Sequence, residues 1–324
     1  MKSVAKDVGY LLRCLPLTSV EYAFAYGSGA VSQAGENVAE KMVDFIVVSN
    51  DSFKFHEENL KTNPSHYSAV RHYGPRRITQ LQRDFGARVF FNTQIKYEGR
   101  LMKYGVISSE HLQEDLLDWR WLYIAGRLHK PVVDVILPSP SLSFALKENR
   151  ASAFQAALLL LPDTFSLQQF FSKIVSLSYN GDFRMWFGED KRKMDKIVSG
   201  NENQFYKLYG DMLENDARVL LRGCRVEQDL STASIYHRMQ LLPSTVLTRL
   251  QRASRKRDLR YRDIEEVIFS LAHRFDPHVD IEKAISSIVA HSVSSQTAKN
   301  VVTAGCVRSV VYALRKVRRM FSSL

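Results

Sequence analysis

Two stretches near the start of the chain decide the expected fold: Tyr22-Ala-Phe-Ala-Tyr-Gly-Ser-Gly-Ala30 and Val43-Asp-Phe-Ile-Val-Val48. Each contains an apolar run of strand length, and the first run stops at Gly27-Ser28-Gly29. The second run carries one acid, Asp44, which needs a metal ion or a cation as its partner in such surroundings. Glycine N–H groups and a serine hydroxyl can donate to phosphate oxygens, and a nearby carboxylate can hold magnesium. The two stretches therefore suggest a nucleoside triphosphate site, with a plain turn and a salt-bridged strand residue as the alternative.

The composition describes a folded protein with an anionic partner. The 324 residues are 45% hydrophobic and 24% charged, with a net charge of +11. This length allows two or three domains, and the charge favours nucleic acid, nucleotide or anionic lipid as a partner. Cys14, Cys224 and Cys306 lie far apart, which indicates reduced thiols. No transmembrane helix is expected, because no window of about twenty residues is apolar without charge. The start of the chain fits an ordinary first helix better than a targeting remnant.

The spacing of apolar residues predicts an α/β (α+β) protein in three parts. Strands are expected at 21–26, 43–49 and 132–137, a hairpin at 88–107, and helices at 4–15, 53–61 and 108–118. The break at Pro138-Ser-Pro140 ends a first domain, 1–140. Helices at 143–161, 166–177 and 203–213, together with a short hairpin, suggest a winged-helix-like domain at 141–215. A C-terminal region, 216–324, completes the chain.

A second group of candidates lies in Gly181-Asp-Phe-Arg-Met185 and Gly188-Glu-Asp-Lys191, where acids and bases alternate around glycines. On the functional interpretation, Arg184 and Lys191 bind phosphates and Asp182 binds a metal ion. The alternative is a solvated hairpin with local ion pairs.

Three single features are weaker candidates. His66-Tyr67 and Lys103-Tyr104 offer base stacking and phosphate binding, with simple packing as the alternative. Asp134 lies in an apolar strand and offers a further metal carboxylate, with an ion pair to Lys130 as the alternative.

The segment from Ala298 to Phe321 has apolar residues at helical spacing. Its basic residues are Arg308, Arg315, Lys316, Arg318 and Arg319. Two interpretations remain open: a helix that faces the core, and an interfacial helix on an anionic membrane. The charges within the segment argue against a membrane-spanning helix.

Ten motifs, taken together, carry a resemblance to a known family. They are Tyr26-Gly-Ser-Gly, Asp44-Phe-Ile, Ser65-His-Tyr-Ser68, Lys103-Tyr-Gly-Val-Ile-Ser108, Leu122-Tyr-Ile-Ala-Gly-Arg-Leu128, Lys130-Pro131, Leu177-Ser-Tyr, Gly181-Asp-Phe-Arg-Met185, Gly188-Glu-Asp-Lys191 and Thr303-Ala-Gly305. In this order they resemble the mitochondrial phosphatidate cytidylyltransferases, the translocator assembly and maintenance family. The resemblance covers about residues 20 to 215, and more loosely the rest of the chain.

The resemblance implies a polymerase-β-like nucleotidyltransferase domain and a winged-helix domain. From its own residues, the C-terminal segment is expected to be a basic amphipathic helix that binds the membrane. The resemblance implies that CTP and phosphatidic acid react to give CDP-diacylglycerol and diphosphate, with Mg2+ as cofactor. It also implies a peripheral protein on the anionic matrix face of the mitochondrial inner membrane, feeding cardiolipin and phosphatidylglycerol synthesis, with no nucleic-acid partner. The matching motifs place nucleotide binding at Tyr26, Gly27, Ser28, Gly29, His66, Tyr67, Lys103 and Tyr104. They place metal binding at Asp44 and Asp182, and catalysis at Asp44, Lys191 and Arg184.

One position departs from the pattern that nucleotidyltransferases of this fold commonly carry, Asp-x-Asp on the second strand. The second position here is Ile46, which argues against two-metal binding of the usual kind. We hypothesise that the acceptor explains the missing carboxylate, because a phosphate monoester has a second pKa near ~6 and arrives ionised. The alternatives are a nucleotidyltransferase acting on RNA or protein, and a non-catalytic membrane assembly factor.

Overall fold

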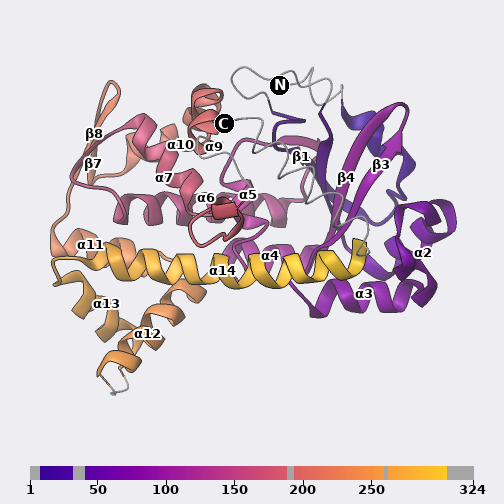
Figure 1. Ribbon diagram of the computed structural model, residues 1–324. Helices are drawn as coiled ribbons and strands as arrows, with labels where there is room; N and C mark the ends of the chain where they lie inside the picture. The colour runs from indigo at the N-terminus through magenta and orange to yellow at the C-terminus, as the bar shows by residue number, and fades with distance from the viewer. Residues whose placement is uncertain (1–7, 32–40, 188–192, 259–261, 305–324) are drawn as a thin grey trace.

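A five-stranded mixed sheet forms one end of the molecule, and helices build the rest (Figure 1). The computed structural model describes residues 8–31, 41–187, 193–258 and 262–304. The sheet has the order β3-β4-β2-β1-β5. Its strands are β1 (Val20–Tyr26), β2 (Val43–Ser49), β3 (Phe90–Tyr97), β4 (Arg100–Ser108) and β5 (Val133–Ile136). Strands β2 and β4 are parallel and the other neighbours antiparallel. The α/β class and all five predicted strands are confirmed.

The two faces of this sheet have different partners, because successive strand residues point to opposite sides. On β2, Ile46 and Val48 join the large hydrophobic cluster of the helices, whereas Phe45 and Val47 join a second cluster. Asp44 shares its face with Ile46, since the two are two residues apart. The second cluster also contains the apolar face predicted for the first helix, Val8, Leu11, Leu12 and Leu15. That segment forms a 3-10 helix, Tyr10–Cys14, which ends before Pro16.

The helices fall into three groups along the chain. Around the sheet lie α2 (Ser52–Thr62), α3 (Gly74–Asp84), α4 (Ser109–Asp118) and α5 (Ala125–Leu128), with 3-10 turns at Pro64–His66 and Ala69–Tyr73. The middle of the chain forms α6 (Pro140–Leu159), α7 (Leu167–Ser176), α8 (Arg184–Phe187), α9 (Lys193–Ser199) and α10 (Glu202–Asn215). The last part forms α11 (Thr232–Gln240), α12 (Ser244–Asp258), α13 (Ile264–Ala272) and α14 (Pro277–Ala304). The predicted helices α2, α4, α6, α7 and α10 are confirmed.

The hairpin expected in the second part of the chain lies later than predicted. Residues 184–187 and 193–199 are helical, and the hairpin is formed by β7 (Val219–Arg222) and β8 (Arg225–Gln228), beyond the predicted limit at 215. Gly223, with φ +62°, makes its turn. Strand β8 also pairs with β6 (Thr164–Ser166), so the hairpin completes a three-stranded sheet beside the helices. This arrangement is typical of a winged helix, but its strands span the predicted boundary.

Packing is continuous across both predicted domain boundaries. The sheet ends at Ile136 and α6 begins at Pro140, next to the predicted break. One hydrophobic cluster nevertheless joins Phe24 of β1, Leu142 of α6 and Ile285 of α14. The division into three domains therefore stays a prediction, since the core does not separate there.

Helix α14 runs along the molecule and ends beside α3 and the sheet (Figure 1). The sequence predicted a helix only from Ala298, and this start is wrong, because Ile281, Ile285 and Ile288 stand at helical spacing before it and are buried in the large cluster. Polar contacts also fix its last part: Gln296 accepts from the Ala87 N–H at 2.8 Å and donates to the Val89 carbonyl at 3.1 Å. The predicted membrane-binding residues Arg308, Arg315, Lys316, Arg318 and Arg319 lie outside the described residues. Among the residues described, none of the helices combines the length and apolarity needed to cross a bilayer.

Lys299 makes the stability of this docking depend on pH. Its ammonium is buried and donates to the carbonyls of Phe85 at 2.9 Å and Gln82 at 3.2 Å. Burial, and then Arg88, lower the pKa of Lys299 to about 7 from its ordinary 10.5, against a raising effect of Asp84. Between these two pKa values the unfolded chain binds one more proton, so the free energy of unfolding rises with pH there and this contribution is flat below about 7.

We expect the free energy of unfolding, measured in urea, to rise between pH 7 and pH 9 by roughly 1–2 kcal/mol more in the wild type than in Lys299→Met. Equal pH dependence in the two proteins would contradict the assignment. The exposed Lys207→Met serves as the control and should follow the wild type.

Candidate active site

The glycine turn and Asp44 meet at one end of the sheet. Tyr26, the last residue of β1, pairs directly with Asp44 of β2. Gly27 follows with φ +73°, and a Cβ there would lie 3.8 Å from Asp44 Oδ2. At Gly29 a Cβ would come within 2.2 Å of the Met42 carbonyl oxygen, so only glycine fits. The turn therefore presents its backbone beside the carboxylate, as the sequence predicted.

Asp44 has the capacity to hold a cation. Its Oδ1 lies 3.6 Å from Lys103 Nζ, and its side chain is 26% exposed. Lys103 is the neighbour of Asp44 on β4, so both point to the same face. Oδ1 is buried and accepts no hydrogen bond within the described part of the chain. An orphaned carboxylate oxygen beside a phosphate-binding turn fits a single magnesium ion that also binds phosphates.

Cations and aromatic rings lie next to Tyr26 and Lys103, the two residues that pair with Asp44 in the sheet. The Arg127 guanidinium lies 4.0 Å from the Tyr123 ring and 5.4 Å from the Tyr26 ring. Lys103 Nζ lies 4.4 Å from the Phe91 ring. Burial acts to raise the pKa of Tyr123, but Arg127, Arg184 and Lys103 together lower it below its ordinary value. Three cations from three separate segments thus act on one side chain, although Lys103 is paired with Asp44 and Arg184 with Asp182.

Asp115 holds the segment that carries Tyr123 and Arg127. Its buried carboxylate accepts from the backbone N–H groups of Trp121, Tyr123, Ile124 and Ala125, at 2.8–3.1 Å. Burial raises the pKa of this carboxyl, and backbone N–H donors, Ala125 first, oppose that rise. These bonds shape the chain between α4 and α5, so Asp115 sets the place of the Arg127 guanidinium without touching it.

Three predicted nucleotide-binding residues lie on the opposite face of the sheet. Tyr104 follows Lys103 in β4, so it points away from Asp44. Asn59 donates to the hydroxyls of Tyr104 at 2.8 Å and Tyr67 at 3.0 Å, and His66 bonds to Tyr104 at 2.9 Å. Both tyrosines are fully buried, which leaves no ring face for a base. Burial also lowers the pKa of His66 to about 4, so it is uncharged at neutral pH. We correct the prediction: these three residues form a polar core behind the site.

Asp182 is also corrected as a metal ligand. Its carboxylate is 3% exposed and forms a two-point ion pair with Arg184, at 2.6 and 2.9 Å. The oxygens are thereby committed to the guanidinium. Asp134 accepts from the Tyr22 hydroxyl at 2.7 Å, which accounts for that carboxylate. Lys191 lies outside the described residues. Within the described ranges no three His, Cys, Asp or Glu side chains gather as a metal site.

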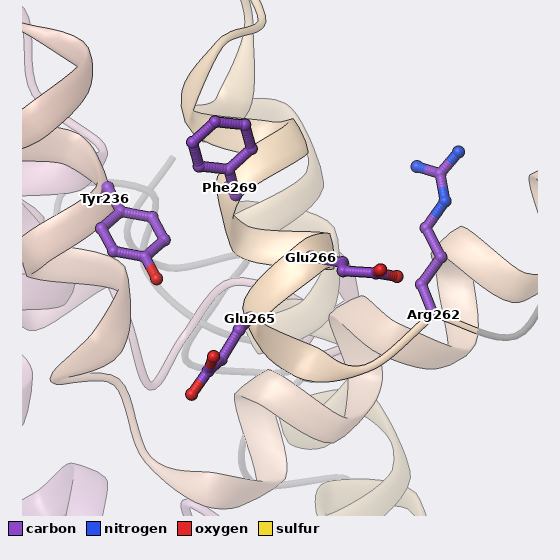
Figure 2. Close-up of a pocket in the computed structure, with 5 residues that line it drawn as sticks. All are labelled: Tyr236, Arg262, Glu265, Glu266 and Phe269. Carbon is purple, nitrogen blue, oxygen red and sulfur yellow. The ribbon is translucent and has the colours of Figure 1, made fainter.

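A separate hollow of about 440 Å³ lies on α11 and α13, away from Asp44 (Figure 2). Tyr236 and Phe269 form its apolar wall, with ring centroids 6.2 Å apart. Figure 2 shows that Glu265 and Glu266 point to different sides of α13. Two acids and one arginine, Arg262, line it, so it does not suit a triphosphate.

Tyr123, Arg127 and Lys130 received no role from the sequence, although the family motifs contained all three. The signal that could have identified Arg127 and Lys130 was that each is a basic residue inside a family motif, within a short helix or shortly after it. Only the fold shows that Arg127 faces Tyr26.

Comparisons with known proteins identify the family of this chain. The profile of a family described as "Phosphatidate cytidylyltransferase, mitochondrial" matches residues 9–319. Relatives with the same printed name include one from Caenorhabditis briggsae, 52% identical over 97% of this chain and 98% of its own length. Others are from Caenorhabditis elegans, 50% identical with the same coverage, and Danio rerio, 40% identical over 92% of this chain and 90% of its own. This chain therefore belongs to the family of mitochondrial phosphatidate cytidylyltransferases.

Proposed function

We propose that this protein transfers CMP from CTP to phosphatidic acid at the Asp44 site, giving CDP-diacylglycerol and diphosphate. The family supplies the reaction class. The observation that carries the assignment to this site is the glycine turn beside Asp44, whose Oδ1 accepts no hydrogen bond within the described residues and lies 3.6 Å from Lys103 Nζ. Both reactants are phosphate anions, so positive charge must outweigh negative charge where they meet.

Asp44 would hold a magnesium ion, which when bound would screen the CTP phosphates and polarise them toward attack. One protein carboxylate is enough for such an ion, because magnesium commonly keeps several waters and takes further oxygens from substrate phosphates. Ile46 occupies the position of the second carboxylate that related folds use, and it lies in the buried core of the sheet.

The chemistry needs little from the protein beyond placement and charge. A phosphatidate phosphate oxygen attacks the α-phosphorus of CTP, a new P–O bond forms there, and the bond to the β-phosphate oxygen breaks to release diphosphate. The Gly27–Gly29 turn holds the triphosphate through backbone N–H groups. Lys103, Arg127 and Arg184 offset the repulsion between the two anions and stabilise charge that shifts to the leaving diphosphate. Because the acceptor is already ionised, no side chain has to remove a proton from it.

We place the protein on the matrix face of the mitochondrial inner membrane, where its product would feed cardiolipin and phosphatidylglycerol synthesis. Two points support this: the relatives are named mitochondrial, and phosphatidic acid resides in a membrane. Attachment through the basic residues between 308 and 319 rests on their sequence pattern alone.

Labelled CTP and vesicles containing phosphatidic acid test the proposal directly. The expected result is magnesium-dependent label in the lipid phase and equal release of diphosphate. Label transferred to RNA or to protein instead would favour the other nucleotidyltransferases, and no transfer at all would favour an assembly factor. Neither alternative has support from the family match.

The pH–rate profile gives a second test. We expect kcat/KM for phosphatidic acid to rise roughly tenfold per pH unit below about 6, where the acceptor loses its second proton, and to level off above it. Glycerol 3-phosphate binding, followed by calorimetry over the same pH range, controls for changes in affinity. A further steep rise above about pH 8 would reveal an essential base and contradict the mechanism.

A further inference from the structure

Two lysines lie over one tyrosine ring beside α5. Lys130 Nζ is 4.8 Å from the centre of the Tyr179 ring, and Lys193 Nζ is 5.3 Å from it. Lys130 also donates to the Ser178 hydroxyl at 2.7 Å. The two lysines are far apart in sequence, and the fold brings them to the same ring.

The charges near Lys130 favour an anion. Within the described residues its hydrogen-bond partner is the Ser178 hydroxyl rather than a carboxylate. Burial lowers the pKa of Lys130 well below its ordinary value, and the nearby cations Arg127 and Lys193 lower it further. A half-buried ammonium among other cations is unfavourable, and a bound anion would relieve this. Lys130 is therefore placed to bind an anion.

A hollow of about 340 Å³ shares the Tyr179 side chain with this charged group. Met185 and Met194 form an apolar part of its lining, and Asn180, Gly181, Glu282 and Ser286 form the rest. Glu282, the acid on its lining, accepts from the Asn180 amide at 2.9 Å, so its charge is partly engaged. Methionines adapt to flexible apolar groups, such as the glycerol and first acyl carbons of a lipid. Cations next to such a lining suit a lipid phosphate better than a nucleotide.

We propose that Lys130 and Lys193, which lie over the Tyr179 ring, bind the phosphate monoester of phosphatidic acid, with Met185 and Met194 against its glycerol end. The identity of this acceptor rests on the proposed function. Arg127, three residues before Lys130, lies over Tyr26 on the Asp44 side. The acceptor subsite therefore adjoins the nucleotide subsite, and Lys103 and the glycine turn remain available to CTP.

Direct binding separates the two subsites without turnover. Calorimetry with soluble dihexanoyl phosphatidic acid should show a roughly 10- to 100-fold weaker Kd for Lys130→Met, because one charge-assisted contact is lost. The Kd for CTP should stay within about twofold. The matched control is Lys207→Met, which removes an exposed lysine on α10 and should leave both values unchanged. Lys193→Gln is a second variant on another element, and it should also weaken phosphatidic acid binding.

Three outcomes would overturn the proposal: unchanged phosphatidic acid binding in folded Lys130→Met and Lys193→Gln, loss of CTP binding instead, or equal wild-type affinity for glycerol 3-phosphate, inorganic phosphate and dihexanoyl phosphatidic acid. The last would indicate a site for free phosphate. A wild-type protein that binds phosphatidic acid but transfers no CMP would refute the proposed function and leave the subsite standing.

Discussion

Asp44→Asn is expected to lower CDP-diacylglycerol formation by about 100- to 1,000-fold, with little change in stability. The amide keeps the size of the side chain but removes the charge that would hold magnesium across the CTP phosphates. Because Asp44 is 26% exposed and lies 3.6 Å from Lys103, the fold tolerates the neutral residue. Initial rates with labelled CTP, measured over a range of magnesium concentrations, test this expectation.

Asp134→Asn is the matched control for this experiment. Asp134 lies on the same sheet, beside β1, and its carboxylate accepts from the Tyr22 hydroxyl at 2.7 Å. An amide oxygen can accept the same bond, so activity should stay within about twofold. Comparable losses of CDP-diacylglycerol formation in the two variants would mean that activity depends on the total negative charge of the sheet and not on Asp44 in particular. Unchanged activity in Asp44→Asn would remove the metal assignment.

Asp115→Ala is expected to lower the free energy of unfolding by about 3–5 kcal/mol, because it leaves four backbone N–H groups without their acceptor in a buried segment. The same change should lower activity in the protein that still folds, since Tyr123 and Arg127 depend on that segment. Urea unfolding gives the stability, and kcat/KM for CTP gives the effect on the site.

The control for Asp115→Ala lies one residue away on α4. Glu114 is exposed, so Glu114→Ala should change the unfolding free energy by no more than about 0.5 kcal/mol. Asp115→Asn should fall between the two, because its single carbonyl oxygen can still accept from part of the segment. A stable Asp115→Ala protein with full activity would show that the four hydrogen bonds do not organise the site.

Adjacent residues of one strand show where sequence reasoning went wrong. Lys103 and Tyr104 were both assigned to the nucleotide because they stand side by side in a motif. In a strand such neighbours must point to opposite faces. Lys103 accordingly contacts Asp44, and Tyr104 joins the buried cluster behind the sheet. Strand alternation could have shown that only one of the two residues faces the nucleotide. Which face of the sheet carries the site depends on which segments pack against each face.

Sequence patterns were sufficient for the five strands of the mixed sheet, the helices α2, α4, α6, α7 and α10, and the meeting of Gly27–Gly29 with Asp44, because each of these depends on local patterns or on a direct neighbour in a strand pair. Two contacts followed only from the packing of the whole chain. It brought Arg127 over Tyr26, and it placed Lys130 and Lys193 on one ring. The physical reason is that charge and burial at a site come from segments distant in sequence. Their mutual distances are fixed only when the apolar faces of the sheet and the helices pack together.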